Sequence, residues 1–128
     1  MIGLFLITHG TLGESLVQCA SHVLGECPLQ LAQLGVAPQD DPIDVLPMAE
    51  LLLLSVDSGE GALVLTDLYG ATPANIVMKL LKPGRVEGVA GVSLPMLLRA
   101  ITYRDRDMTT LVAKAVAGGR DGVLAMNP

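Results

Sequence analysis

Two residues with reactive side chains each follow an apolar stretch of strand length. His9 comes directly after the stretch at residues 2–8, and Asp67 comes directly after the stretch at residues 62–66. A histidine acts as a nucleophile when one ring nitrogen is unprotonated. A carboxylate bonded to the other ring N–H fixes that tautomer and stabilises positive charge on the ring. If the two strands are neighbours, His9 and Asp67 face each other, and the pair predicts a histidine that accepts a phosphoryl group.

Residues suited to binding phosphoryl oxygens lie close by in the sequence. Gly10 stands at the end of the first strand, and Gly70, Ala71 and Thr72 stand shortly beyond the third. Thr72 with proline after it is typical of a helix N-terminus, where backbone N–H groups and the positive end of the helix dipole bind anions. Thr72 adds a hydroxyl, and the glycines let the backbone approach closely. We therefore predict a phosphate site that needs no metal ion and no cofactor.

Each of these residues also has a purely structural interpretation. A single histidine at a strand end is often a hydrogen-bonding residue of the fold, and aspartate favours turns, so Asp67 is equally suited to capping one. Thr72 fits a helix cap whether or not it contacts phosphate. From the residues alone, both interpretations stay open for His9 and Asp67.

The elements that must position this site alternate between strand and helix patterns. Apolar stretches of strand length occur at residues 2–8, 29–34, 62–66, 86–92 and 122–126. Helical patterns lie between them, at residues 13–24, from Thr72, at residues 96–101 and after Asp107. This alternation predicts an α/β fold: a mostly parallel open sheet of four to five strands with helices on both faces, forming one domain over residues 1–128. Ligands of such sheets bind beyond the carboxyl ends of the strands.

Two helix boundaries are less clear from the pattern. Asp41 and Pro42 form a good helix start, but Pro47 then lies inside the helix, so the helix either kinks at Pro47 or begins there. At the other end of the chain, Gly118 and Gly119 predict the end of the last helix before a short terminal strand.

Composition excludes several classes of protein. The net charge is −5, only 2% of residues are aromatic, and the first 78 residues contain no Lys or Arg. Nucleic-acid binding is therefore not expected, and a nucleotide phosphate loop with its lysine is absent. Cys19 and Cys27 are not spaced for a disulfide or a zinc site, which favours the reducing cytoplasm. The apolar stretch at residues 51–54 is far shorter than the roughly 20 residues of a membrane span, so no membrane insertion is expected.

Three segments in a fixed order carry a family resemblance: residues 5–10 (FLITHG), 66–75 (TDLYGATPAN) and 89–97 (VAGVSLPML). They resemble the IIA component of the mannose family of the bacterial phosphoenolpyruvate-dependent sugar phosphotransferase system, and the tail at residues 111–125 also matches. The resemblance implies that the domain accepts a phosphoryl group from the phosphocarrier HPr and passes it to a IIB component.

The resemblance also assigns roles. It implies that His9 is the phosphoryl acceptor, that Asp67 hydrogen-bonds it, and that Thr72 belongs to the phosphate-binding turn with Gly70 and Ala71. It further implies a homodimer in which an antiparallel edge strand is exchanged between the two copies. An exposed sheet edge and an apolar terminal segment independently favour a dimer.

The sequence departs from the usual family pattern at several positions. Ala71, Thr72 and Ala74 replace the usual Gly, Ser and aromatic residue of the turn, and Ser93 replaces an Asn. A Cβ at Ala71 narrows the backbone angles that the turn can adopt. We expect these changes to affect the rate of transfer and the choice of partner more than phosphorylation itself.

Two other functions are compatible with the sequence. One is the phosphotransfer subunit that feeds a dihydroxyacetone kinase, whose first domain has the same fold and histidine. The other is a small-ligand binding module of flavodoxin-like fold without chemistry, in which Tyr69 is the one aromatic residue placed to stack on a flavin.

Overall fold

Four parallel strands form one sheet in the computed structural model, which describes residues 1–128. Their order across the sheet is β2, β1, β3, β4. The bounds of the strands are β1 Gly3–His9, β2 Leu31–Val36, β3 Ala62–Thr66 and β4 Val86–Ala90. This confirms the predicted parallel α/β sheet, with four strands, and it places β1 directly beside β3.

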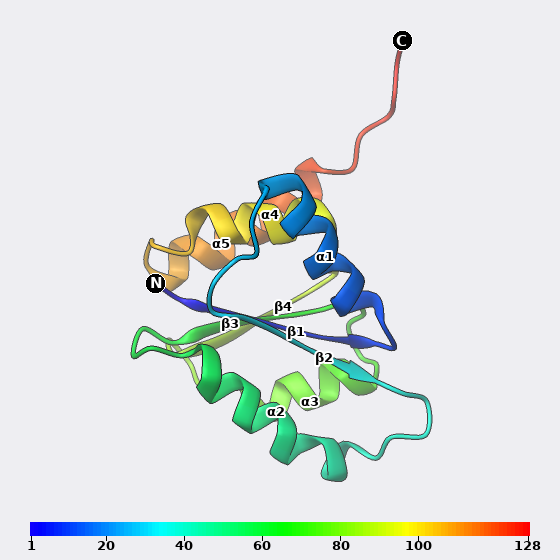
Figure 1. Ribbon diagram of the computed structural model, residues 1–128, viewed down its shortest axis with the longest axis vertical. Helices are drawn as coiled ribbons and strands as arrows, with labels where there is room; N and C mark the ends of the chain where they lie inside the picture. Colours follow the sequence, from blue (N-terminus) through cyan, green and yellow to red (C-terminus); the bar gives the residue numbers. More distant parts are fainter.

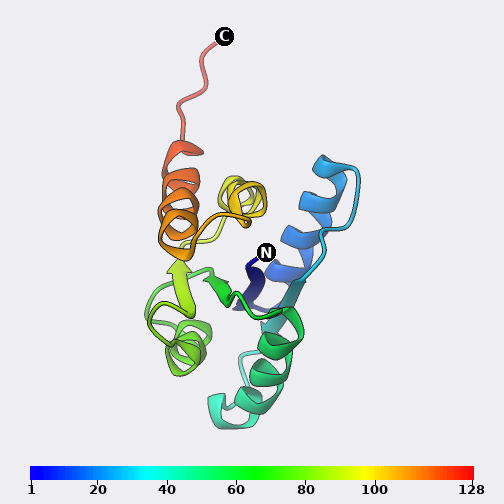
Figure 2. The same ribbon diagram turned by 90° about the vertical axis from the view of Figure 1, so that its left-hand side faces the viewer.

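Five helices cover the two faces of the sheet (Figure 1). On one face lie α1 Leu12–Leu24, α4 Leu94–Tyr103 and α5 Met108–Asp121. On the other lie α2 Pro42–Val56 and α3 Thr72–Leu80. The view along the layers shows the sheet between these two groups of helices (Figure 2). No helix combines the length and the apolar character that crossing a membrane requires.

The alternation of side chains along the central strands creates two separate cores. In β1, Leu4 and Leu6 pack under α1, α4 and α5, whereas Phe5 and Ile7 pack against α2 and α3. All of β3 is buried as well. A strand buried on both faces carries apolar side chains at nearly every position, and in these two strands the buried exceptions are Thr8 and Thr66 near the carboxyl ends.

The structure shows at which of its two prolines α2 begins. It begins at Pro42, and the side chain of Asp41 accepts a hydrogen bond from the N–H of Ile43 at 3.0 Å. The helix then continues through Pro47 to its end. Asp41 therefore acts as the predicted cap, and Pro47 does not mark the beginning of the helix.

The end of the chain differs from the prediction. Helix α5 runs through Gly118 and Gly119 to Asp121, and Gly118 is buried against Arg99, where a Cβ would lie 2.6 Å from the arginine Cβ. The two glycines thus allow close helix packing instead of ending the helix. The predicted strand at residues 122–126 was wrong for the single chain, because this segment continues from the end of α5 away from the sheet and pairs with no strand (Figure 1).

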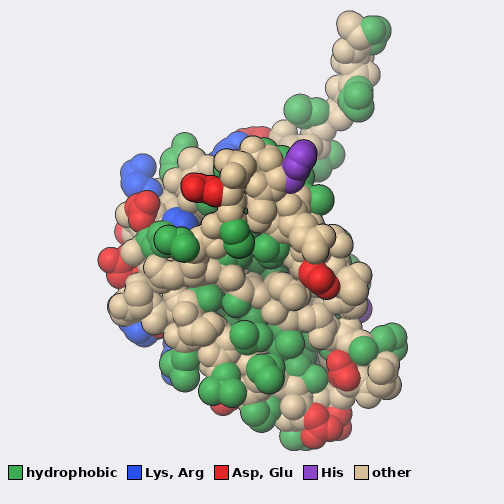
Figure 3. All heavy atoms as spheres, viewed as in Figure 1, with side chains coloured by type: hydrophobic (Ala, Val, Ile, Leu, Met, Phe, Trp, Pro, Cys, Tyr) green, Lys and Arg blue, Asp and Glu red, His purple; other side chains and the backbone are tan.

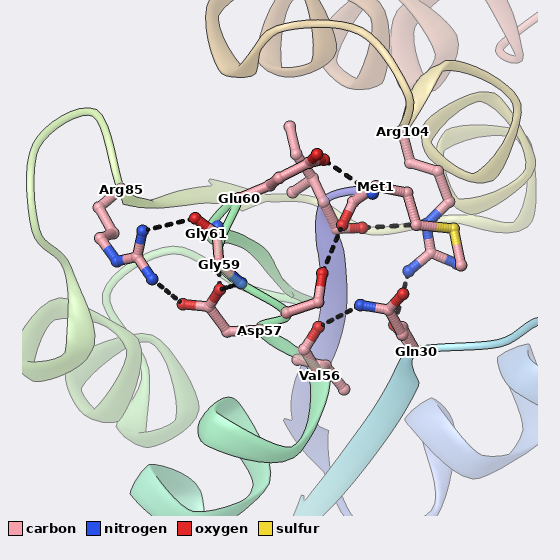
Figure 4. A network of polar contacts seen from close by, with 11 residues as sticks. Met1, Gln30, Val56, Asp57, Gly59, Glu60, Gly61, Arg85 and Arg104 are labelled. Carbon is pink, nitrogen blue, oxygen red and sulfur yellow. Dashed lines mark hydrogen bonds and ion pairs between the residues drawn. The ribbon is translucent and has the colours of Figure 1, made fainter.

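The end of the sheet opposite the strands' carboxyl ends is held by Arg104 (Figure 4). Its side chain is 4% exposed and donates to the backbone carbonyls of Ile2 at 3.0 Å, Leu29 at 2.5 Å and Gln30 at 2.6 Å. Burial lowers the pKa of Arg104 below its ordinary value, but an arginine stays charged at neutral pH. One guanidinium therefore joins the end of α4 to the beginnings of β1 and β2.

We predict that Arg104→Met destabilises the protein by about 3 kcal/mol, because it removes one donor from each of three backbone carbonyls around a buried position. Urea unfolding followed by circular dichroism measures the change. Arg106→Met is the matched control, since Arg106 is exposed and its side chain makes no hydrogen bond; it should change stability by less than about 0.5 kcal/mol. Equal effects of the two substitutions would contradict the role of Arg104.

Candidate functional site

His9 and Asp67 meet at the carboxyl ends of β1 and β3. The register of these strands ends at the pair of Ile7 and Thr66, so Asp67 follows β3 beside the last residues of β1. His9 Nδ1 lies 2.8 Å from Asp67 Oδ2, and the backbone N–H of His9 donates to the same oxygen at 3.2 Å. The predicted juxtaposition is confirmed, and Asp67 does more than end a turn.

The two side chains differ in exposure and in charge. The side chain of His9 is 51% exposed and that of Asp67 is 14% exposed. Burial alone would raise the pKa of Asp67, but the hydrogen bonds from the ring and the backbone N–H of His9 outweigh it and hold the pKa below its ordinary value. An ionised carboxylate only accepts hydrogen bonds, so Nδ1 carries the ring proton. Nε2 is then the nitrogen with a free lone pair.

The side chain of His9 borders a crevice of about 480 Å³. The residues that line this crevice are His9, Gly10, Val36, Ala37, Pro38 and Thr72. Two of the predicted phosphate-binding residues, Gly10 and Thr72, therefore line the same crevice as the histidine. Gly70 instead lines a neighbouring apolar pocket, and Ala71 lines neither. Gly10 and Gly70 have positive φ values of 51° and 83°, which glycine adopts at low cost.

The beginning of α3 forms one wall of the crevice. Ala71 occupies the N-cap position and Thr72 is the first helical residue, so the prediction that Thr72 is the cap was off by one position. The cap makes no side-chain hydrogen bond. The first backbone N–H groups of α3 are therefore not occupied by a capping side chain, which suits a helix end that binds an anion.

The sequence analysis did not single out two residues that fix the loop between β1 and α1, which contains His9. The hydroxyl of Thr8, fully buried, accepts a hydrogen bond from the N–H of Gly13 at 2.8 Å and so ties the end of β1 to the start of α1. Gly35 lets β2 approach the same loop, because a Cβ there would lie 2.1 Å from the carbonyl oxygen of Gly10. A glycine inside a strand was the available signal for Gly35; no sequence pattern marked Thr8.

Two hydrogen bonds between Ala37 and Asp40 stabilise the loop after β2. The carboxylate of Asp40 accepts a hydrogen bond from the N–H of Ala37 at 2.8 Å, and the N–H of Asp40 donates to the carbonyl of Ala37 at 3.0 Å. This pair of bonds closes the loop that brings Ala37 and Pro38 to the crevice. Asp40 thus shapes the crevice wall.

Comparison with known proteins identifies the family. The model of the family described as "PTS system fructose IIA component" matches residues 3–117. The chain belongs to this family, the mannose-type IIA components of the phosphotransferase system. It is 31% identical over 128 residues to the "PTS system mannose-specific EIIAB component" of Escherichia coli (strain K12), covering 98% of this chain and 39% of that relative. The chain thus spans well under half the length of the curated relatives that it matches.

Solved structures show the same fold. The phosphotransferase system component EIIA from Streptococcus agalactiae superposes with a TM-score of 0.86 at 22% identity, covering 98% of this chain and 97% of that one. The mannose/sorbose specific IIA subunit from Enterococcus faecalis superposes with a TM-score of 0.84 at 24% identity, covering 99% and 96%. At these identities the likeness concerns the fold alone.

The structure accommodates two departures from the usual family sequence. Ala71 has φ −92° and ψ 175°, an extended conformation that any residue adopts, so its Cβ strains nothing. Ser93 is the N-cap of α4, and its hydroxyl accepts a hydrogen bond from the N–H of Met96 at 3.3 Å. Both substitutions are therefore compatible with the local structure.

Asp67→Asn should make stability less sensitive to acid. Because the pKa of Asp67 in the folded protein lies below its ordinary 3.8, its ionised form adds stability that is present above that value and is lost as pH falls through the folded pKa. We expect the wild type to exceed the variant by about 1 kcal/mol at neutral pH, since solvent screens the half-exposed histidine. Urea unfolding between about pH 7 and pH 2 tests this. A difference that stays constant throughout would contradict it.

Proposed function

We propose that this chain is a phosphoryl carrier of the sugar phosphotransferase system, and that His9 takes the phosphoryl group from phospho-HPr and passes it to a IIB component. The observation that carries the proposal is the bond between His9 Nδ1 and Asp67 at 2.8 Å, which leaves Nε2 free in an open crevice. Family membership over residues 3–117 supports the same conclusion. The carrier works in the cytoplasm, where phospho-HPr is its donor.

The transfer is a nucleophilic substitution at phosphorus. The lone pair of His9 Nε2 attacks, the Nε2–P bond forms as the P–N bond of the donor histidine breaks, and the donor nitrogen keeps the electron pair. His9 loses no proton in this step, because Nδ1 keeps its own. Positive charge grows on the ring, and the carboxylate of Asp67 stabilises it.

The phosphoryl oxygens bind at the beginning of α3. The backbone N–H groups of its first turn and the hydroxyl of Thr72 supply donors, and the positive end of the helix dipole favours the negative charge. Such a site needs neither a metal ion nor a cofactor. Transfer to IIB is the reverse reaction, with the histidine now the donor.

Incubation with phosphoenolpyruvate, enzyme I and HPr should add one phosphoryl group to the wild type, whereas ATP alone should add none. Mass spectrometry at neutral pH detects the product, which should be labile to acid and stable to base, as a phosphoramidate is. Absence of the added mass would refute the proposal.

Two variants serve as its controls. His9→Ala should not be phosphorylated, because no other residue in the crevice is a nitrogen nucleophile. Asp67→Asn should be phosphorylated at a rate lower by about 10²–10⁴-fold, since the ring loses the charge that orients and stabilises it. Phosphorylation of His9→Ala at the wild-type rate would place the acceptor elsewhere.

We also propose that the functional form is a homodimer in which the segment at residues 122–126 of one copy pairs with the edge of β4 in the other. Strand β4 pairs along its length only with β3. The terminal segment leaves its side chains in solvent, with Val123 82%, Leu124 78% and Met126 97% exposed. Pockets of about 320 and 330 Å³ include β4 residues and lie toward α3 and toward α5, respectively. A strand whose apolar side chains alternate fits both.

Removal of residues 123–128 should convert a dimer into a monomer. Light scattering at micromolar concentration measures the mass of both proteins, and circular dichroism shows that the shortened chain keeps its helices. A wild type that is monomeric, or a shortened chain that is still a dimer, would contradict the exchanged strand.

A further inference from the structure

The residues on both sides of His9 are bonded to other elements of the fold. The hydroxyl of Thr8 accepts a hydrogen bond from the N–H of Gly13 in α1 at 2.8 Å. The N–H of Gly10 donates to the carbonyl of Val36 at the end of β2 at 2.9 Å. His9 is therefore anchored through its neighbours to α1 and to β2. Of these two bonds, the one made by Thr8 depends on a side chain.

The hydroxyl of Thr8 occupies a place where an apolar group would fit as well. Thr8 is fully buried, and no other residue of β1 before His9 has a polar side chain. Burying a hydroxyl costs free energy unless it is hydrogen-bonded, and a valine would fill the same space without that cost. Thr66, at the end of β3, is the contrasting case, because it is 3% exposed and its hydroxyl makes no hydrogen bond.

The bond from Gly13 to Thr8 also fixes the beginning of α1. Thr11 is the N-cap residue of this helix and makes no side-chain hydrogen bond. Gly13 is buried in the first turn, so its N–H would have no partner without Thr8. A Cβ at Gly13 would lie 3.0 Å from the hydroxyl oxygen, so the two residues are in close contact. The loop that contains His9 is thus closed between Thr8 and Gly13.

Thr8 acts from the face of the sheet opposite to the crevice. Its partner α1 lies on one face, whereas α3, whose first residue Thr72 lines the crevice, lies on the other (Figure 1). Because Thr8 is fully buried, it forms no part of the surface that another protein contacts, on which the space-filling view shows hydrophobic and charged side chains (Figure 3). A change at Thr8 therefore reaches the reaction only through the position of His9.

We propose that Thr8 is a positioning residue for phosphoryl transfer. Its bond to Gly13 holds the backbone of His9 where the ring bonds to Asp67 and borders the crevice. The attacking nitrogen, the phosphorus and the leaving nitrogen must lie roughly in line, so a displacement of about 1 Å at the ring lowers the rate by up to about 10²-fold. This inference rests on the proposed function, since it assigns a role in the same transfer.

Thr8→Val tests the proposal, because valine keeps the shape of the side chain and removes the acceptor. We expect the rate at saturating phospho-HPr to fall about 10- to 100-fold while KM for phospho-HPr stays within about twofold. Thr8→Ser retains the acceptor and should transfer within about threefold of the wild-type rate. The matched control is Thr66→Val, the same substitution at a buried hydroxyl that makes no hydrogen bond, which should change neither the rate nor KM.

Nitrogen NMR of the neutral imidazole ring of His9 gives a readout that does not depend on transfer. In the wild type the ring proton should lie on Nδ1, and in Thr8→Val it should be shared between Nδ1 and Nε2 as the bond to Asp67 weakens. A threonine that only stabilised the fold would lower the urea midpoint of unfolding without changing this distribution. If Thr8→Val does not fold, Thr8→Ala removes the same acceptor and is measured in its place.

The outcomes separate the two proposals. A wild type that accepts no phosphoryl group refutes the proposed function. A wild type that is phosphorylated, with a Thr8→Val variant that keeps the wild-type rate or the wild-type proton position, overturns the role of Thr8 and leaves the function standing. A rise in KM at an unchanged saturating rate, or an equal loss of rate in Thr66→Val, would also overturn that role.

Discussion

The bond between His9 and Asp67 is the constraint on which the site depends. It spans the carboxyl ends of two neighbouring parallel strands, so it forms only if β1 and β3 are adjacent and in register. Asp67 accepts from both the ring and the backbone N–H of His9, and thereby fixes the position of the loop as well as the tautomer. Because one carboxylate oxygen accepts both bonds, the orientation of the imidazole ring is set by the fold itself.

The two ends of the sheet differ in how open they are to solvent. At the carboxyl ends, the chain leaves a crevice open to solvent and relies on short contacts, such as the approach of Gly35 to Gly10, to keep it in shape. At the opposite end, Arg104 fills the space between elements and satisfies three carbonyls at once. This division fits the proposed function, because a site that receives a group from another protein must stay open to it, whereas the opposite end can be closed by buried contacts.

The sequence determined the architecture and singled out the two residues that the structure brings together, His9 and Asp67. Continuous apolar runs alternating with helical patterns fix a parallel sheet between helices, since period and length are local properties of the chain. Asp41 before Pro42 indicated one of two possible starts of α2, and His9 and Asp67 were singled out because each follows an apolar stretch of strand length. Free cysteines were predictable as well, from the spacing of Cys19 and Cys27.

Only the tertiary structure decided what depends on contacts between distant segments. The side chain of Arg104 donates to carbonyls that lie 74 to 102 residues away in the sequence. No local sequence pattern predicts such distant partners. In the sequence Thr8 does not differ from other strand residues. Only the fold brings the N–H of Gly13 to its hydroxyl. The terminal apolar segment has the pattern of a strand, yet a strand forms only where the segment meets the edge of a sheet, and within one chain this segment pairs with no strand. Sequence specifies local conformation, whereas packing decides which surfaces remain unpaired.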